Sequence, residues 1–187
     1  MQIRCDCGIF RAELAAFPRN PPGRLVCYCD DCQSYLEKLG RQDLLDPYDG
    51  TEIVPVYPSE FNIVSGQQAL RCNRLSEQGL NRWSTTCCNS PIANTRARFP
   101  WVGLIHSTFT VDDPTYLEKT FGAVRSRIYG RYAKEGHPFP IAEKMGLKDM
   151  LAVLPFLLKG FMLKKHRHSQ FFKDDGTSPI AEPSILS

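Results

Sequence analysis

Residues 24–40 read RLVCYCDDCQSYLEKLG, and this stretch holds the strongest structural signal in the chain. Within it, Cys27, Cys29 and Cys32 follow one another as C-x-C-x-x-C. Thiolates at this spacing can converge on one soft cation, and a set of sulfur ligands suits zinc. The stretch therefore predicts a zinc site.

The residues around this cluster predict a strand followed by a helix. The apolar run Leu25–Tyr28 is typical of a strand. Asp30 or Asp31 can cap a helix that ends at Gly40. Cys32 would then lie in the first helical turn, where backbone N–H groups stabilise a thiolate.

Cysteines far from this cluster show related spacings. Cys5 and Cys7 form a C-x-C followed by Gly8, which can adopt the positive φ that a metal-binding turn in a hairpin requires. Cys87 and Cys88 are adjacent and lie far downstream. Neighbouring residues in an extended strand point to opposite faces, so these two thiols can share a metal only where the chain kinks.

Disulfides are the main alternative for the eight cysteines. Cysteines one or two residues apart rarely reach disulfide geometry, and the first residues lack the basic and apolar regions of a secretory signal. We therefore expect a reducing, cytoplasmic location. A redox pair of Cys87 and Cys88 is a further alternative, but it would close a strained ring.

Size and charge limit the classes of protein and partner. The chain has 187 residues, with 23 basic and 20 acidic side chains and a net charge of +3. This balance argues against nucleic acid as a partner. The longest apolar run, Met150–Leu158, is shorter than the roughly 20 residues of a membrane span, so no membrane span is predicted. We expect a zinc-binding β domain over residues 1–112 and a helical C-terminal extension over 113–187, packed on it.

Apolar patterns predict a mainly β (α+β) fold. Five segments separated by turn residues read as strands: Ile53–Tyr57, Phe61–Val64, Ala69–Leu75, Leu80–Thr86 and Val102–Thr110. Pro55 argues against a central position for the first of them. Apolar residues three or four apart predict a helix from Pro114 to Gly136, and a second helix is predicted from Leu147 to Leu163.

The order of these motifs resembles the glutathione-dependent formaldehyde-activating enzyme (GFA) family, which is also typified by centromere protein V. The resemblance rests on C-x-C-G from Cys5, C-x-C-x-x-C from Cys27, Val64-Ser65-Gly66 with Ala69-Leu70, and C-N-S-P-I from Cys88. It does not extend to the C-terminal helices. The resemblance implies an Mss4-like zinc-binding β fold with two neighbouring zinc sites.

The resemblance also assigns roles to the cysteines. The first, structural site is assigned Cys5, Cys7 and Cys88. The second site, assigned Cys27, Cys29 and Cys32, keeps an open position on its zinc for a substrate thiol. That site is the expected catalytic centre of a carbon–sulfur lyase, and the expected partner is a small thiol or a thiol–aldehyde adduct of the glutathione–formaldehyde type. One or two Zn²⁺ ions per chain are expected.

The sequence departs from the family pattern in the first site. Thr85 occupies the position of one family cysteine, and Asn89 replaces the glycine after the last one. Asn tolerates the left-handed conformation best among the non-glycine residues, so the turn can persist. The fourth ligand is then Cys87 or Cys72, and Cys87 is favoured if the turn supplies the kink.

Two functional interpretations stay open. Three thiolates on Zn²⁺ leave a net charge of −1, which damps Lewis acidity and favours delivery of a thiolate over activation of water. In this interpretation the second site is reactive. In the other, His106 or Cys72 closes that site, both zinc ions are structural, and the chain is a non-catalytic zinc-stabilised binding or scaffold module.

The C-terminal part contains a basic run, 164–168, directly after the predicted apolar helix. We expect these cations to complement the helix dipole, and the helix to pack either on the β domain or, in a homodimer, on a second copy of the chain. A surface-seeking element that docks on a membrane or a partner is the alternative. Arg127 and Arg131 read as the solvated face of the preceding helix, although they could attract the carboxylates of a peptide thiol.

Overall fold

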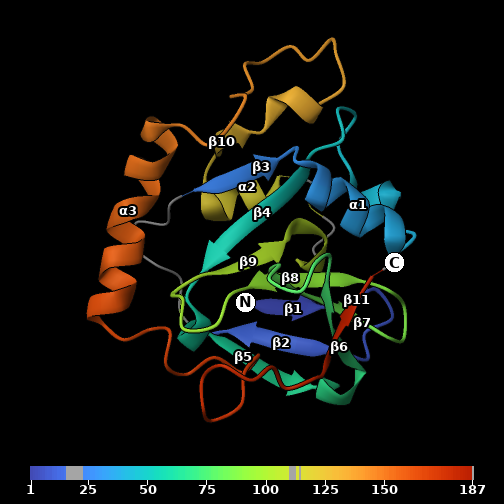
Figure 1. Cartoon of the computed structure of the whole chain (residues 1–187), viewed down its shortest axis with the longest axis vertical. Helices are drawn as coiled ribbons and strands as arrows, with labels where there is room; N and C mark the ends of the chain where they lie inside the picture. The colour runs from blue at the N-terminus through green and yellow to red at the C-terminus, as the bar shows by residue number, and fades with distance from the viewer. Residues whose placement is uncertain (16–22, 110–112, 114, 187) are drawn as a thin grey trace.

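Two β-sheets form the body of the protein in a computed structural model that describes residues 1–15, 23–109, 113 and 115–186 (Figure 1). The larger sheet has the order β10-β3-β4-β9-β8-β7-β6-β11, and the smaller has the order β1-β2-β5. The β10–β3 and β11–β6 pairs are parallel, whereas the other pairs are antiparallel. The predicted mainly β, α+β class is confirmed.

The strands of both sheets and the α-helices have the following bounds. The larger sheet contains β3 (Arg24–Cys27), β4 (Thr51–Val56), β6 (Leu70–Arg74), β7 (Asn81–Thr85), β8 (Pro91–Thr95), β9 (Val102–Ile105), β10 (Val124–Ile128) and β11 (Pro183–Ile185). The smaller sheet contains β1 (Gln2–Arg4), β2 (Arg11–Leu14) and β5 (Phe61–Ser65). The α-helices are α1 (Asp30–Lys38), α2 (Tyr116–Phe121) and α3 (Leu147–Met162).

The main core is shared by the two sheets. Phe10 and Phe61 from the smaller sheet region belong to one buried cluster with Trp83 and Leu104 of the larger sheet. Phe171, from the C-terminal segment, lies with its ring centroid 4.8 Å from Phe61 and 5.0 Å from Trp83. Large aromatic rings therefore join the ends of the chain to its centre.

Gly66 is required where the turn after β5 meets the turn between β1 and β2. Its φ is +74°, and an added Cβ would lie 2.3 Å from the carbonyl oxygen of Ile9. A residue with a side chain would meet both the conformational penalty and this contact. The close approach of the β1–β2 turn, which carries two cysteines, thus depends on this glycine.

The five predicted strands correspond to β4, β5, β6, β7 and β9. The expectation against a central first strand is wrong, because β4 lies between β3 and β9. β3 pairs with Thr51–Ile53 only, so Pro55 lies beyond these pairs and removes no hydrogen bond to β3. β8 escaped prediction because Pro91 and Asn94 resemble turn residues.

The predicted helix from Pro114 to Gly136 is wrong over most of its length. α2 covers only Tyr116–Phe121 and ends at Gly122, which has a φ of +79°. The chain then forms β10, which pairs in parallel with β3. Backbone hydrogen bonding to a sheet edge overrides a helical pattern that continues past a glycine.

The C-terminal segment is therefore only partly helical. It supplies both edge strands of the larger sheet, β10 and β11, besides α3, which matches the predicted helix. The boundary between a β domain and a C-terminal extension at residue 112 stays a prediction.

Within the described chain, no helix combines the length and the hydrophobicity that crossing a membrane requires. Two ends of predicted segments, Thr110 of the last strand and Pro114 of the first helix, lie outside the described residues.

Candidate metal centres

The first candidate centre lies at the junction of β3 and α1 and is formed by Cys27, Cys29 and Cys32, here called the three-thiol cluster. Cys27 ends β3, and Cys32 lies in the first turn of α1, as predicted. The predicted cap is wrong, because the N-cap is Cys29, and Asp30 and Asp31 lie inside the first turn. The Sγ atoms of Cys27 and Cys29 are 3.3 Å apart, and all three Sγ atoms lie within 4.8 Å of one another. Zinc bound tetrahedrally with Zn–S bonds near 2.3 Å would place its sulfur ligands about 3.8 Å apart. The cluster is therefore compatible with a metal ion.

A buried arginine compensates the negative charge of this cluster. Arg82, on β7, is only 3% exposed. Its Nη1 lies 3.8 Å from the Sγ of Cys32, and its Nη2 lies 3.5 Å from Oδ2 of Asp31. The guanidinium also stands over the ring of Tyr35, 5.3 Å from the centroid. The arginine is thus held by an aromatic ring, a carboxylate and a thiol.

The three thiols do not ionise equally. Hydrogen bonds from Cys27 and Cys29 hold the pKa of Cys32 well below its ordinary value, against the opposing effect of burial, and Arg82 adds to this effect. Hydrogen bonding with Cys29 and Cys32 raises the pKa of Cys27. Negative charge therefore concentrates on Cys32, beside the arginine and the helix N-terminus.

The three-thiol cluster opens into a cavity of about 420 Å³. Its lining combines apolar, aromatic, cationic and acidic side chains: Leu25, Ile128, Met145, Trp101, Tyr129, Tyr132, Arg82, Arg131, Asp30 and Asp31. Arg131 was expected on the wet face of a helix. It is exposed, as expected, but it also lines this cavity, because the chain after Gly122 forms a strand and a turn rather than a helix.

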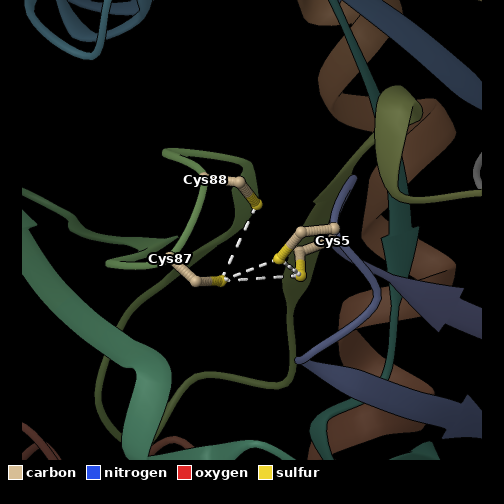
Figure 2. Close-up of side chains that lie close together, drawn as sticks. Cys5, Cys87 and Cys88 are labelled. Atoms are coloured by element: carbon tan, nitrogen blue, oxygen red, sulfur yellow. Dashed lines mark hydrogen bonds between the residues drawn. The ribbon is translucent and has the colours of Figure 1, made fainter.

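The second candidate centre is the four-thiol cluster of Cys5, Cys7, Cys87 and Cys88. Two turns far apart in the sequence form it: one between β1 and β2, and one after β7 (Figure 2). The Sγ of Cys7 lies 3.5 Å from Cys5 and 3.2 Å from Cys87. The Sγ of Cys87 lies 3.9 Å from Cys5 and 3.8 Å from Cys88. These spacings are also compatible with one metal ion.

Left-handed residues shape both turns of the four-thiol cluster. Gly8 has a φ of +73° and Asn89 a φ of +54°, which confirms the conformation predicted for each. The kink needed for adjacent cysteines is present, because residues 86–88 form a turn. The backbone N–H of Asp6 donates to Oγ of Ser90 at 3.0 Å and so ties the two turns together.

Hydroxyl groups surround Cys88. Burial raises the pKa of Cys88, but contacts with Oγ of Ser90, at 3.2 Å, and Oγ1 of Thr85, at 3.4 Å, bring it down to about 5. Thr85 thus contacts the cluster through a hydroxyl where the resembled family has a cysteine. Cys87 supplies the fourth thiol in its place.

Neither alternative ligand from the sequence joins a cluster among the described residues. Cys72 is fully buried on β6. His106 lines a separate cavity of about 360 Å³ with Asp46 and Glu52, and its Nδ1 has no hydrogen-bond partner. Position therefore favours Cys87 over Cys72 as the fourth thiol of this cluster, and the assignment of metal ligands stays a prediction.

Sequence reasoning missed Arg82, the charged group that contacts the three-thiol cluster. The signal available was weak: a basic residue between Asn81 and Trp83 in a predicted strand. Alternation of apolar and polar residues along a strand predicts one buried and one exposed face, which would place Arg82 in solvent. In the structure every residue of β7 is buried. A buried arginine requires partners, and here they are the carboxylate of Asp31 and the thiol of Cys32.

One protein-family model matches nearly the whole chain. Residues 1–184 match the protein family described as "Family of unknown function (DUF6151)". The chain belongs to this family. Both cysteine clusters of this DUF6151 chain lie within the matched residues.

A solved structure is also similar to part of this chain. A crystal structure of a Rhodobacter sphaeroides protein is similar over 66% of this chain and 97% of its own length, with 18% sequence identity and a TM-score of 0.46. No curated protein matches the chain in sequence.

Proposed function

We propose that this protein is a zinc-dependent, carbon–sulfur lyase-like enzyme acting on a thiol–aldehyde adduct of the glutathione–formaldehyde type. One observation supports this most: Cys27, Cys29 and Cys32 gather without a fourth Cys, His, Asp or Glu ligand among the described residues, and they face a cavity. Catalytic zinc sites keep such an open position, whereas structural sites are closed by four protein ligands. The resemblance of the motifs to the GFA family, with its Mss4-like zinc fold, supports the same proposal.

The donor set of thiols suits zinc at both clusters. Zinc held by the three-thiol cluster would supply a stabilised substrate thiolate at neutral pH. In the proposed reaction, the sulfur of a thiol bonds to the carbonyl carbon of an aldehyde and the thiol proton ends on the oxygen. The reverse reaction breaks the same carbon–sulfur bond and restores both groups, so no oxidant or reductant is needed.

The residues of the chain have distinct parts in this proposal. Arg82 offsets the excess negative charge of three thiolates and holds Cys32 in place. Arg131, at the cavity, provides a cation for a substrate carboxylate, and Trp101 and Tyr129 provide surfaces for its apolar parts. The cavity of about 420 Å³ lies within the range of small-molecule sites.

A second candidate function is a non-catalytic, zinc-stabilised binding or scaffold module. The four-thiol cluster favours it, because four thiolates leave no open position and join two turns that are far apart in sequence. In that case the three-thiol cluster also has no catalytic role and only stabilises the folded state. The two candidates differ in what the loss of a single thiol does.

Paired substitutions in the two clusters test the proposal. We expect wild-type protein purified without chelator to hold zinc at both clusters. Cys29→Ser should lose the zinc of the three-thiol cluster, keep the fold and no longer convert a glutathione–formaldehyde adduct. Cys7→Ser, the matched variant in the other cluster, should lose the other zinc and stability, yet keep turnover in the fraction that stays folded. Metal analysis, circular dichroism and an assay of adduct consumption give the three readouts.

Two results would contradict the catalytic proposal. If wild-type protein with both zinc ions consumes no thiol–aldehyde adduct, the scaffold candidate gains. If Cys29→Ser unfolds the protein as much as Cys7→Ser does, the three-thiol cluster is a fold staple.

A further inference from the structure

Helix α3 exposes a broad apolar face. Of its residues, only Phe156 and Gly160 are buried. The exposed apolar residues range from 43% to 81% exposure, and we call them the α3 apolar face: Leu147, Met150, Leu151, Leu154, Leu158, Phe161 and Met162. They recur every three or four positions, so they form one stripe along the helix. A contiguous apolar surface of this kind marks an interaction site.

The inner side of α3 fixes the direction of this face. The ring of Phe156 stacks on Tyr57 with centroids 4.1 Å apart, and the hydroxyl of Tyr57 donates to the backbone oxygen of Phe156 at 2.9 Å. At Gly160 an added Cβ would lie 2.6 Å from Pro100, so the helix is in close contact there. Figure 1 shows α3 along one side of the molecule, with no other described element on its outer side. The apolar face therefore points away from the core of the protein.

Basic residues accompany the apolar face at both ends of the helix. Residues 143–168 contain six Lys and Arg but two Asp and Glu, a net charge of +4, whereas the whole chain carries +3. Lys144 and Lys148 lie at the N-terminal end, and Lys159, Lys164 and Arg167 lie at the C-terminal end; all five are exposed. Lys148 and Lys159 are about three turns apart and so border the same side of the stripe.

We propose that α3 docks this protein on an anionic phospholipid surface, with its apolar face in the acyl boundary and the flanking cations at the headgroups. Interfacial helices combine these features: a wide apolar face and lysines on the polar face that borders it. Lys and Arg side chains can extend toward headgroup phosphates while their stems cover apolar surface. This inference does not depend on the metal centres or on the proposed reaction.

Charge distinguishes the lipid surface from a second copy of the chain. In an antiparallel contact between two α3 helices, the basic C-terminal end of one would face Lys144 and Lys148 of the other. In a parallel contact, the two basic C-terminal ends would meet. Either arrangement places like charges beside an apolar interface, which costs free energy. An anionic bilayer provides opposite charge along the whole helix.

Vesicle co-sedimentation with the full chain tests the proposal. We expect the protein to bind vesicles of phosphatidylcholine with phosphatidylserine at least about tenfold more tightly than vesicles of phosphatidylcholine alone, with weaker binding at high salt. Leu154→Gln with Leu158→Gln should weaken binding by more than about tenfold, because Gln keeps the helix but not the apolar face. Lys159→Glu should weaken it by about fivefold or more.

Matched controls lie on the smaller sheet. Val64→Gln replaces an apolar residue that is 56% exposed, and Arg4→Glu makes the same change of charge as Lys159→Glu. Both should bind vesicles as the wild type does. Circular dichroism and urea unfolding confirm that each variant is folded.

Three results would overturn the proposal. The first is wild-type protein that does not bind phosphatidylserine vesicles. The second is equal loss of binding in Arg4→Glu and Lys159→Glu, which would reflect net charge alone. The third is a dimer in sedimentation velocity that the double Gln variant dissociates, because a second copy would then cover α3.

Discussion

The two cysteine clusters differ in where their ligands come from and in what surrounds them. The three-thiol cluster comes from six consecutive residues at one strand-to-helix junction, beside a buried arginine and a cavity. The four-thiol cluster joins two turns separated by 80 positions, and two of its thiols, on Cys7 and Cys87, are exposed. A local cluster can lose its metal without releasing distant parts of the chain, whereas a long-range cluster cannot. Under the proposed function, the same ligand type serves reactivity in one cluster and cohesion in the other.

The sharpest test of this difference is the loss of Cys5, the fully buried member of the four-thiol cluster. Cys5→Ser should lower the free energy of unfolding by about 4 kcal/mol or more, because the loss of the metal frees both turns. Cys29→Ser should cost less than half as much. Urea unfolding with zinc analysis measures both. Equal losses would break the comparison, because both clusters would then be staples.

Cys72 provides the control for this experiment. It is as buried as Cys5 but belongs to neither cluster. Cys72→Ala should leave the zinc content unchanged and cost about 1 kcal/mol, from the loss of a small buried side chain. A loss of zinc in this variant would place Cys72 among the ligands and contradict the grouping.

Arg82 gives the next largest effect. Arg82→Gln should weaken zinc binding at the three-thiol cluster by about tenfold or more, because a neighbouring group that supports a ligand is removed. It should also destabilise the fold by about 2–3 kcal/mol, since Asp31 and Cys32 lose a buried partner. Titration with a competing zinc chelator distinguishes the two zinc ions by their affinities and so measures the change at the three-thiol cluster.

Arg71 is the matched arginine beside the other cluster, where its Nη2 donates to Oδ1 of Asn89 at 2.8 Å. Arg71→Gln should change stability by less than about 1 kcal/mol and leave zinc affinity at the three-thiol cluster unchanged. If Arg82→Gln changes stability but not zinc affinity, Arg82 supports the fold alone.

Asn89 gives the smallest effect and tests the turn of the four-thiol cluster. Asn89→Ala should cost about 1 kcal/mol, because its φ of +54° is unfavourable for a residue with a Cβ and a short apolar side chain. Asn89→Gly should restore most of that loss, since glycine adopts this conformation freely. Thermal unfolding compares the two. Equal stability of Ala and Gly variants would show that the left-handed turn contributes little.

Local patterns predicted much of the fold and of the candidate sites. The C-x-C-x-x-C spacing placed three thiols at a strand-to-helix junction, and α1 and β3 lie where they were expected. Asn89 was expected in the left-handed region and is there. These features depend on neighbours within a few residues, so local sequence is sufficient for them.

Long-range pairing explains the failures. The pattern after residue 116 repeats like a helix, yet β10 forms because the edge of β3 offers backbone hydrogen bonds. β11 pairs with β6, more than a hundred residues away in the chain, and nothing in its own three residues indicates this partner. Sheet edges are created by tertiary structure, and they recruit segments whose local preference is weak.

The sequence by itself determined that thiols would gather, because residues one to three positions apart share a turn whatever the rest of the chain does. It also determined the turns at Gly8 and Asn89. Only the tertiary structure decided that Cys87 rather than Cys72 joins Cys5 and Cys7, and that Arg82 lies against Cys32. These contacts join segments that are distant along the chain, and their positions depend on how the two sheets pack as a whole.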